Sequence, residues 1–177
     1  MLENAETLNT QAIELAYHGD YKEAIACFKR ALSMETSNYL LWFNLGLTYR
    51  DAGEFKEAKA ALEQALAIND DDQEVLETLA LLCNSLGEFH EAISYCTDAL
   101  QLNQSNAHIW NTTGVILFNN GEYDTACTAF EQAVMYNPYY YDAVYNLRDT
   151  YDELGNTVGA AMCSQQMKSL SKGNHDA

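Results

Sequence analysis

The sequence has 177 residues and a formal net charge of −17, which arises from 26 acidic and 9 basic residues. Nucleic acids and anionic membranes are bound by basic surfaces, so this charge argues against both as partners. The hydrophobic content of 48% excludes disorder by composition, and the length is sufficient for one domain with a substantial core. No stretch approaches the roughly 18 apolar residues of a membrane span, so we expect no membrane insertion.

The N-terminal residues Met1 to Asn4 show no basic segment followed by an apolar one, so we expect no signal peptide. The five cysteines are an odd number and include no Cys-x-x-Cys pair. We interpret them as reduced thiols that pack as small hydrophobic residues. Both observations favour a cytoplasmic protein.

A glycine recurs every 34 residues along the chain, at Gly19, Gly53, Gly87, Gly121 and Gly155. An aromatic residue follows two positions later in four of the five cases, and an alanine follows five positions later in all of them. A period of this length is typical of stacked helical hairpins. We therefore divide the chain into five hairpin units, which span residues 5–38, 39–72, 73–106, 107–140 and 141–174.

Each unit is predicted to hold one helix before its glycine and a second helix after it. Asn or Asp precedes four of the first helices as an N-cap, at Asn4, Asn38, Asp72 and Asn106. Acidic residues open four of the second helices, where the helix dipole favours negative charge, at Asp20, Glu54, Glu88 and Glu122. The glycine between the two helices is predicted to be a left-handed C-cap.

The second unit shows how the two helices of a hairpin pack. Trp42, Leu45, Gly46 and Tyr49 fall on one helical stripe, which we expect to face Ala58, Leu62 and Ala65 of the second helix. Gly46 and Ala58 would let the two helices approach closely. Trp42 and its counterpart Trp110 are therefore predicted to be core residues.

The fifth unit departs from this pattern. It carries Arg148 at the small-residue position of its first helix, Thr157 where an aromatic is usual, and Ser164 where a large residue is usual. Because repeat arrays need a polar outer end, we expect its second helix, at about 157–170, to be a C-terminal cap. Residues 171–177 are predicted to be a tail.

The residue types at these offsets resemble the tetratricopeptide repeat (TPR) family, and the resemblance covers residues 5 to about 170. It implies an all-α fold, a right-handed α-solenoid of helix-turn-helix units, with residues 1–177 forming a single TPR domain. It also implies a non-catalytic module for protein–protein interaction.

The sequence contains no recognisable motif for catalysis, phosphate binding or metal binding. The four histidines have no partner at metal-ligand spacing, and no phosphate loop or nucleophile elbow occurs. The run from Asp70 to Asp72 lacks the alternating spacing and the glycine of a calcium loop. We therefore expect no enzyme activity, no catalytic residues, no metal and no cofactor.

The resemblance places the second, fifth, ninth and twelfth residues of each first helix in a concave groove. The ninth position is aliphatic in four successive units, at Ile13, Leu47, Leu81 and Val115. Either these residues form an exposed apolar strip, which usually marks a binding site, or the adjacent repeat partly covers them. In the family, an asparagine at the sixth position often holds a bound peptide backbone, and Asn44 and Asn146 match it. The predicted peptide-binding groove comprises Ile13, Leu40, Phe43, Asn44, Leu47, Arg50, Glu74, Glu77, Leu81, Asn111, Val115, Phe118, Tyr145, Asn146 and Asp149.

Acidic residues flank this groove, at Glu74, Glu77, Asp142, Asp149, Asp152 and Glu153. The expected partner is a peptide or helix segment of another protein, with apolar anchors and basic residues. Arg50 is the one cation among the groove positions, which argues against the terminal-carboxylate clamp of co-chaperones in this family. Two alternatives stay open: a self-assembling scaffold, with the tyrosines at 136 and 139–141 as contact, and a secretion-type chaperone for a partly apolar client.

Overall fold

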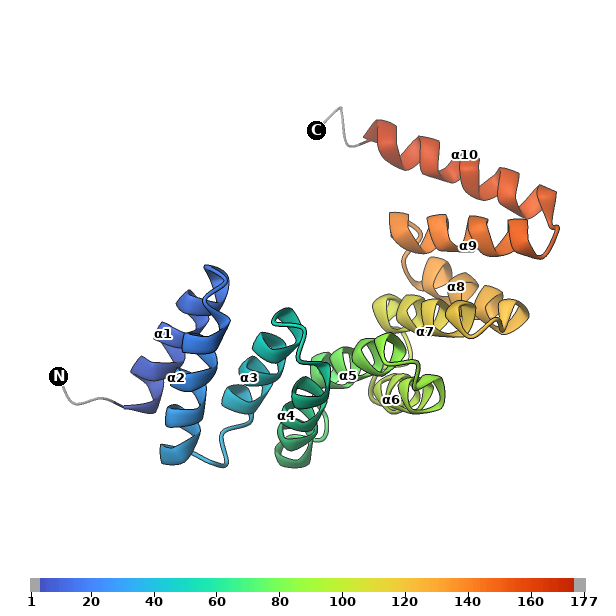
Figure 1. The fold of residues 1–177 in the computed structure, drawn as a ribbon. Helices are drawn as coiled ribbons and strands as arrows, with labels where there is room; N and C mark the ends of the chain where they lie inside the picture. The colour runs from blue at the N-terminus through green and yellow to red at the C-terminus, as the bar shows by residue number, and fades with distance from the viewer. Residues whose placement is uncertain (1–3, 174–177) are drawn as a thin grey trace. The chain divides into compact units, whose positions relative to one another are not determined.

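The computed structural model describes residues 4–173 of the chain, and side chains as far as residue 171. Over this range the chain forms ten α-helices and no β-strand (Figure 1). We call the first helix of each hairpin an A helix and the second a B helix. The A helices are α1 (Ala5–Tyr17), α3 (Tyr39–Asp51), α5 (Gln73–Ser85), α7 (Ala107–Asn119) and α9 (Tyr141–Glu153). The B helices are α2 (Tyr21–Met34), α4 (Phe55–Ile68), α6 (Phe89–Leu102), α8 (Tyr123–Tyr136) and α10 (Thr157–Gly173).

The ends of the helices follow the local sequence signals. The side chains of Asn4, Asp72 and Asn106 each accept a hydrogen bond from a backbone N–H in the first turn of an A helix. Asn38 makes no such cap; its side-chain amide instead donates to Glu35 Oε2 at 2.9 Å. The five repeat glycines all have positive φ, for example +79° at Gly53, a conformation that glycine adopts without steric cost. Each period therefore ends its A helix at the predicted residue.

The chain divides into two compact units, residues 1–86 and residues 87–177, and each is described by itself. In the first unit, α1 pairs with α2 and α3 pairs with α4, while α3 also packs on α2 and α5 packs on α4. In the second unit, α7 lies between α6 and α8, and α9 lies between α8 and α10. The prediction of a single domain over residues 1–177 stays a prediction.

Hairpin packing depends on a small residue in the A helix opposite a large one in the B helix. A methyl group added to Gly46 would lie 2.6 Å from Leu62 Cγ, and one added to Gly114 would lie 2.5 Å from the ring of Phe130. In the fifth repeat the small residue is Gly159 on the B helix, where a methyl group would lie 2.7 Å from the ring of Tyr151. The close approach is therefore kept, but the two helices exchange the roles of small and large residue.

Two predictions about the fold are refined. Trp110 packs against the hydrophobic core as predicted, but Trp42 and Trp110 are both half-buried. Each indole Nε1–H reaches the turn before its helix and donates at 2.8 Å, to the carbonyls of Thr36 and Gln104. The last helix was expected to end near residue 170, but α10 continues to Gly173. The rest of the predicted tail, residues 174–177, lies outside the described residues.

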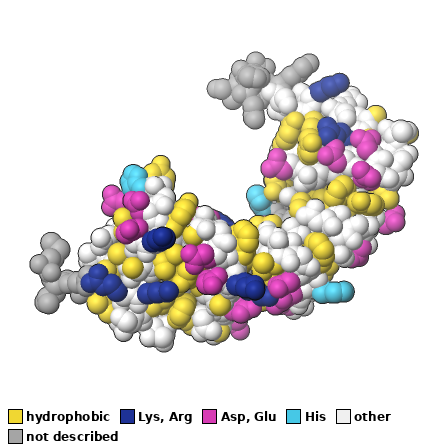
Figure 2. Space-filling model, viewed as in Figure 1, with side chains coloured by type: hydrophobic (Ala, Val, Ile, Leu, Met, Phe, Trp, Pro, Cys, Tyr) yellow, Lys and Arg dark blue, Asp and Glu magenta, His cyan; other side chains and the backbone are white. Residues whose placement is uncertain are grey.

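Basic residues are unevenly distributed along the chain. Between Lys59 and Arg148 the sequence contains no lysine or arginine. Helix α2 carries Lys22, Lys29 and Arg30 against one acidic residue, Glu23. In the view of Figure 2 the lysine and arginine side chains lie in the parts formed by the early and the last helices.

No helix in the described range is both long and apolar enough to cross a membrane.

Candidate functional site

A small pocket lies on the A helices of the first unit. It has a volume of about 190 Å³ and is bounded by α1, α2 and α3. Ile13 and Leu47, which both occupy the ninth position of their repeats, contribute aliphatic walls, and Phe28 of α2 contributes an aromatic one. Asn44 brings a polar amide to the same pocket. The remaining lining residues are Ala16, Tyr17, Thr48 and Asp51.

The second unit contains a pocket built from the same repeat positions. It has a volume of about 140 Å³ and is lined by Val115, Phe118, Asn119, Phe130, Asn146 and Asp149. Each of these residues lies three 34-residue periods after a residue of the first pocket: Ile13 corresponds to Val115, Ala16 to Phe118, Tyr17 to Asn119, Phe28 to Phe130, Asn44 to Asn146 and Leu47 to Asp149. The repeat geometry therefore places an equivalent pocket between successive A helices in both units. We call them the first and the second A pocket.

An asparagine pair borders each A pocket. Asn44 Nδ2 donates to Asn9 Oδ1 at 3.2 Å in the first unit, and Asn146 Nδ2 donates to Asn111 Oδ1 at 2.9 Å in the second. In both pairs, the donor occupies the sixth position of one repeat and the acceptor occupies the fifth position of the repeat before it. The pairs thus link neighbouring A helices next to the pockets and orient the amides of Asn44 and Asn146.

The pair in the second unit belongs to a longer hydrogen-bonded chain. Asn111 Nδ2 donates to the hydroxyl of Tyr140 at 3.4 Å, and this hydroxyl lies 3.2 Å from His108 Nδ1. The rings of His108 and Tyr140 also contact each other, with centroids 4.6 Å apart and planes tilted by 40°. Tyr140 therefore holds the start of α9 against α7.

Comparison with known families identifies the repeat. Residues 15–82, 73–106 and 107–140 each match a tetratricopeptide repeat family, and together these matches run from residue 15 to residue 140. This chain belongs to the TPR family. TPR proteins are generally non-catalytic protein-interaction modules, and the all-α solenoid predicted from the sequence is confirmed.

Solved structures share the TPR fold at low sequence identity. A crystal structure of MamA matches with a TM-score of 0.85 and 22% identity, over 94% of this chain and 97% of that one. The MamA protein of Desulfovibrio magneticus RS-1 matches with a TM-score of 0.86 and 13% identity, over 98% of both chains. YrrB, described as a TPR protein with an unusual peptide-binding site, matches with a TM-score of 0.73 and 24% identity, over 94% of this chain and 86% of that one. A search of curated protein sequences finds no match.

The predicted TPR groove residues fall into three groups. Ile13, Asn44, Leu47, Val115, Phe118, Asn146 and Asp149 line the two A pockets. Exposed or half-buried residues outside these pockets are Leu40, Arg50, Glu74, Glu77, Leu81 and Tyr145. Phe43 and Asn111 are only 8% exposed. A ligand on this face therefore has little access to Phe43 and Asn111, and Asn111 instead positions Asn146.

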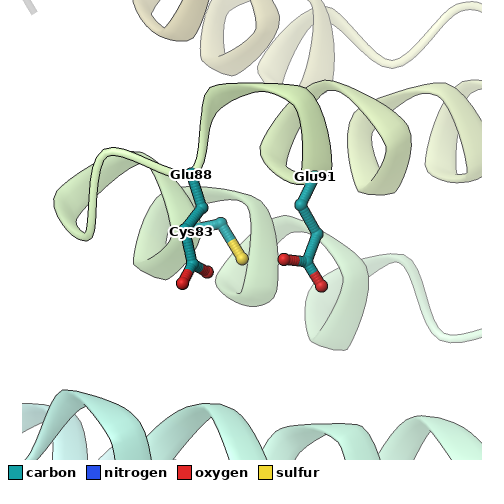
Figure 3. Close-up of side chains that lie close together, drawn as sticks. All are labelled: Cys83, Glu88 and Glu91. Atoms are coloured by element: carbon teal, nitrogen blue, oxygen red, sulfur yellow. The ribbon is translucent and has the colours of Figure 1, made fainter.

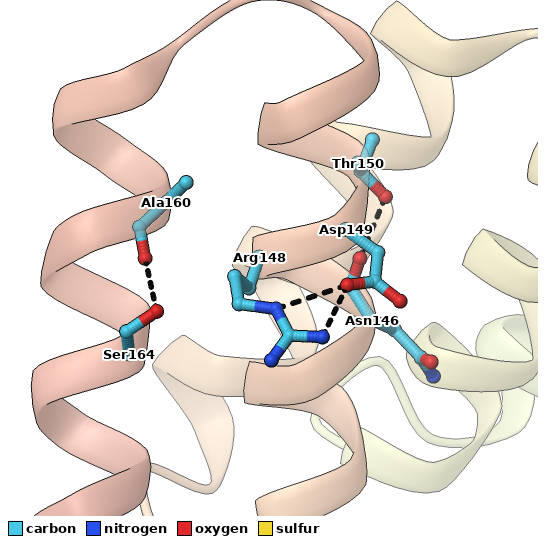
Figure 4. A network of polar contacts seen from close by, with 6 residues as sticks. All are labelled: Asn146, Arg148, Asp149, Thr150, Ala160 and Ser164. Atoms are coloured by element: carbon cyan, nitrogen blue, oxygen red, sulfur yellow. Dashed lines mark hydrogen bonds and ion pairs between the residues drawn. The ribbon is translucent and has the colours of Figure 1, made fainter.

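Charge around the A pockets is more balanced than the acidic composition suggested. Asp149 accepts hydrogen bonds from the guanidinium of Arg148, with Nε at 2.9 Å, and these bonds raise the pKa of Arg148 (Figure 4). The Arg148 guanidinium carbon also lies 4.3 Å from the ring centroid of Tyr145. In the first unit, Asp51 pairs with Arg50 at 2.8 Å. The carboxylates at both pockets are therefore compensated by neighbouring arginines.

Sequence reasoning missed the aromatic walls of the A pockets. Phe28 and Phe130 come from B helices, whereas the groove predicted from the sequence contains A-helix residues alone. Both occupy the same repeat position, which also holds Leu62, Cys96 and Ser164. A phenylalanine at this position is large enough to pack on its own A helix and to reach the seam with the next one. The recurrence of Phe after three periods was the available signal.

The cysteines are all buried free thiols. Burial, together with the carboxylate of Glu131, raises the pKa of Cys127 to about 11, so this thiol is protonated at neutral pH.

Figure 3 draws Cys83 of α5 with Glu88 and Glu91 from the start of α6. Glu88 and Glu91 lie at the N-terminus of α6, where the positive end of the helix dipole stabilises negative charge. The dipole is a sufficient reason for two acidic residues at these positions.

Proposed function

We propose that this TPR protein binds a peptide or helix segment of a partner protein on the face of its A helices. The observation that carries the proposal is the recurrence of one pocket design in both units. Each A pocket combines a ninth-position aliphatic residue, a B-helix phenylalanine and a sixth-position asparagine. Concave sites with apolar walls and a few convergent polar groups are the usual form of a binding site.

The size of the pockets favours single side chains as their occupants. Volumes of about 190 and 140 Å³ fall below the range of about 300–1,000 Å³ that is typical of small-molecule sites. Apolar anchors of a peptide would enter them, and the exposed Leu81 of the first unit adds apolar surface on the same set of helices. Recognition of this kind gives specificity through the spacing of anchor residues.

The asparagines supply the polar part of the recognition. An asparagine side chain offers two N–H donors and a carbonyl acceptor, so one hydrogen bond to Asn9 or Asn111 does not exhaust Asn44 or Asn146. Their amides can pair with both the N–H and the C=O of a bound backbone. Because the neighbouring asparagine already fixes the amide, less side-chain entropy is lost on binding.

Basic residues in the partner would be selected by the exposed carboxylates of this face. Glu74 at the start of α5, and Asp142 and Asp152 on α9, are exposed. Asp149 contributes less to this selection, since Arg148 neutralises it.

The five cysteines are buried and form no disulfide, which fits a reducing compartment, and we propose that the protein acts in the cytoplasm.

A random peptide library displayed on phage, selected on the immobilised full chain, tests the proposal. We expect enriched sequences that combine apolar anchors with lysine or arginine. Amide hydrogen exchange with a synthetic copy of the enriched peptide should then show protection in the A helices beside the pockets, α3 and α9. No enrichment, or protection confined to B helices, would contradict the proposal.

A further inference from the structure

A further pocket of the first unit lies away from the A pockets, between two B helices. This α2–α4 groove has a volume of about 580 Å³, within the range of about 300–1,000 Å³ that is typical of small-molecule sites. Both A pockets fall below that range. Ser33 of α2 and Ala60 of α4 line the groove, and such small side chains leave space between the two helices. The volume therefore fits a small molecule as the occupant.

The floor of the groove is apolar and includes an aromatic ring. Leu45 of α3 and Ala61 of α4 line it and are buried. Trp42 also lines it, and its indole Nε1–H donates to the carbonyl of Thr36 at 2.8 Å. Because this bond satisfies the polar atom of the indole and orients the ring, Trp42 offers an ordered aromatic surface to a ligand. An aromatic group of a ligand would gain most from packing there.

Charges of both signs lie at one end of the groove. Lys29 of α2 and Glu57 of α4 are lining residues with exposed side chains. Lys29 Nζ lies 5.5 Å from the centroid of the Tyr49 ring. Contact with Tyr49 and, to a smaller extent, attraction to nearby carboxylates that include Glu57 raise the pKa of Lys29. The groove therefore presents an ammonium close to a carboxylate at neutral pH.

The two charges are not paired with each other. Among the described residues, neither Lys29 nor Glu57 forms an ion pair. Glu57 belongs to the first turn of α4, whereas Gln64 lines the groove about two turns later, or about 10 Å along the helix. The polar groups thus have an order: two opposite charges at one end, the apolar floor, and an amide at the other end. A matching ligand has a positive and a negative group side by side, followed by an apolar body.

We propose that the α2–α4 groove binds a free aromatic amino acid. Its carboxylate faces Lys29, its ammonium faces Glu57, and its side chain packs against Trp42. A free amino acid carries both charged groups on the same carbon atom, so long side chains from α2 and α4 can reach them together. An anion alone would be repelled by Glu57, and a cation alone would be repelled by Lys29.

Three forms of phenylalanine separate the two charges of the ligand. L-Phenylalanine carries both, N-acetyl-L-phenylalanine keeps only the carboxylate, and L-phenylalaninamide keeps only the ammonium. Trp42 reports on binding by its fluorescence, and the change Trp110→Phe removes the other tryptophan, which belongs to the second unit. We expect L-phenylalanine to give a saturable change in emission. The other two forms should bind about threefold to fivefold more weakly, because exposed ion pairs are individually weak.

Neutralising variants test which residue meets which charge. In Glu57→Gln, L-phenylalanine should lose its advantage over the N-acetyl form, and in Lys29→Met it should lose its advantage over the amide. The controls Glu63→Gln and Lys22→Met remove exposed charges from the same two helices outside the groove lining. Both controls should bind all three forms as the wild type does.

A variant that fills the groove tests the location of the site. The double change Ser33→Met/Ala60→Met introduces residues that the second unit already holds at the equivalent positions, Met135 and Met162, so helical circular dichroism should match the wild type. Affinity for L-phenylalanine should fall at least about tenfold.

Three outcomes would overturn the proposal. They are the absence of a saturable response to L-phenylalanine, equal affinity for any two of its three forms in the wild type when one of the two is L-phenylalanine, and unchanged affinity in the filled variant. The site goes beyond the proposed peptide binding, since the α2–α4 groove shares no lining residue with either A pocket. Peptide affinity measured on the filled variant therefore tests the other function separately.

Discussion

Asn146 on α9 donates a hydrogen bond of 2.9 Å to Asn111 on α7, across the seam between the fourth and fifth repeats. The same contact joins Asn44 and Asn9 in the first unit at 3.2 Å. The two pairs differ in burial, because Asn111 is 8% exposed and Asn9 is more accessible to solvent. The contact therefore joins the same repeat positions in both units, and we expect it to contribute more to stability in the second unit, where its acceptor is buried.

Replacing Asn146 with alanine should destabilise the second unit by about 1–3 kcal/mol, since the buried carbonyl of Asn111 loses a donor that water cannot easily replace. The matched change Asn44→Ala should cost less, about 0.5–1.5 kcal/mol, because solvent reaches Asn9. Urea unfolding monitored by circular dichroism measures both. Equal losses in the two variants would show that burial of the acceptor does not determine the cost.

Close packing of the second repeat predicts a cost for Gly46→Ala, although alanine is the better helix former. The added methyl group would meet Leu62 Cγ at 2.6 Å, and overpacking of this kind costs about 1–3 kcal/mol. The third repeat carries Ala80 and Cys96 at the two equivalent positions. The double variant Gly46→Ala/Leu62→Cys should therefore be more stable than the sum of its single changes predicts.

A double-mutant cycle from thermal or urea unfolding measures this coupling. Gly114→Ala combined with Leu62→Cys is the control, because these residues belong to different repeats and their effects should add. Additive effects for Gly46 and Leu62 as well would show that the two side chains do not compete for space.

Much of the fold could be predicted from the sequence because the same helix-ending and helix-capping residue types recur in each repeat. The positive φ of the five glycines and three of the four predicted caps follow from residue types that have few other uses at helix ends. Asn38 is the exception: its side-chain N–H donates to Glu35, and in this orientation its side-chain oxygen does not cap α3. Residue type alone does not predict the orientation.

The candidate site was harder to predict because the exposure of an A-helix residue depends on the neighbouring repeat. Phe43 and Asn111 occupy the same fifth position as Asn9, yet both are buried and Asn9 is not. Asn111 is covered where Tyr140 and Asn146 meet it, through contacts with residues about 30 positions away. The arginines beside Asp51 and Asp149 were visible in the sequence, but the orientation of their side chains was not.

Burial of Cys127 and Tyr151 predicts a loss of stability at high pH. The pKa of Cys127 is raised from 9.0 to about 11, chiefly by burial, and burial with a hydrogen bond to Glu131 also raises the pKa of Tyr151. A raised pKa in the folded state contributes stability below the unfolded pKa, and this is lost as pH rises through the folded value. The free energy of unfolding should therefore fall between about pH 9 and pH 11 in part because of Cys127.

The variant Cys127→Ala isolates this contribution. Its free energy of unfolding should decline less steeply than that of the wild type over the same pH range. Cys96→Ala, another buried thiol, serves as the comparison for the loss of the sulfur itself. Identical pH slopes for the wild type and Cys127→Ala would mean that this thiol does not titrate differently in the folded chain.

Binding of a peptide to the A helices is the central claim, and an affinity comparison tests it most directly. Fluorescence anisotropy would measure the affinity of a peptide enriched on the wild type for the variant Ile13→Glu/Leu81→Glu and for the control Leu102→Glu. The side chains of Ile13, Leu81 and Leu102 are all exposed. We expect the double variant to bind at least about tenfold more weakly, a loss of about 1.4 kcal/mol, and the control to bind as the wild type does. Unchanged affinity in a folded Ile13→Glu/Leu81→Glu variant would contradict peptide binding on this face.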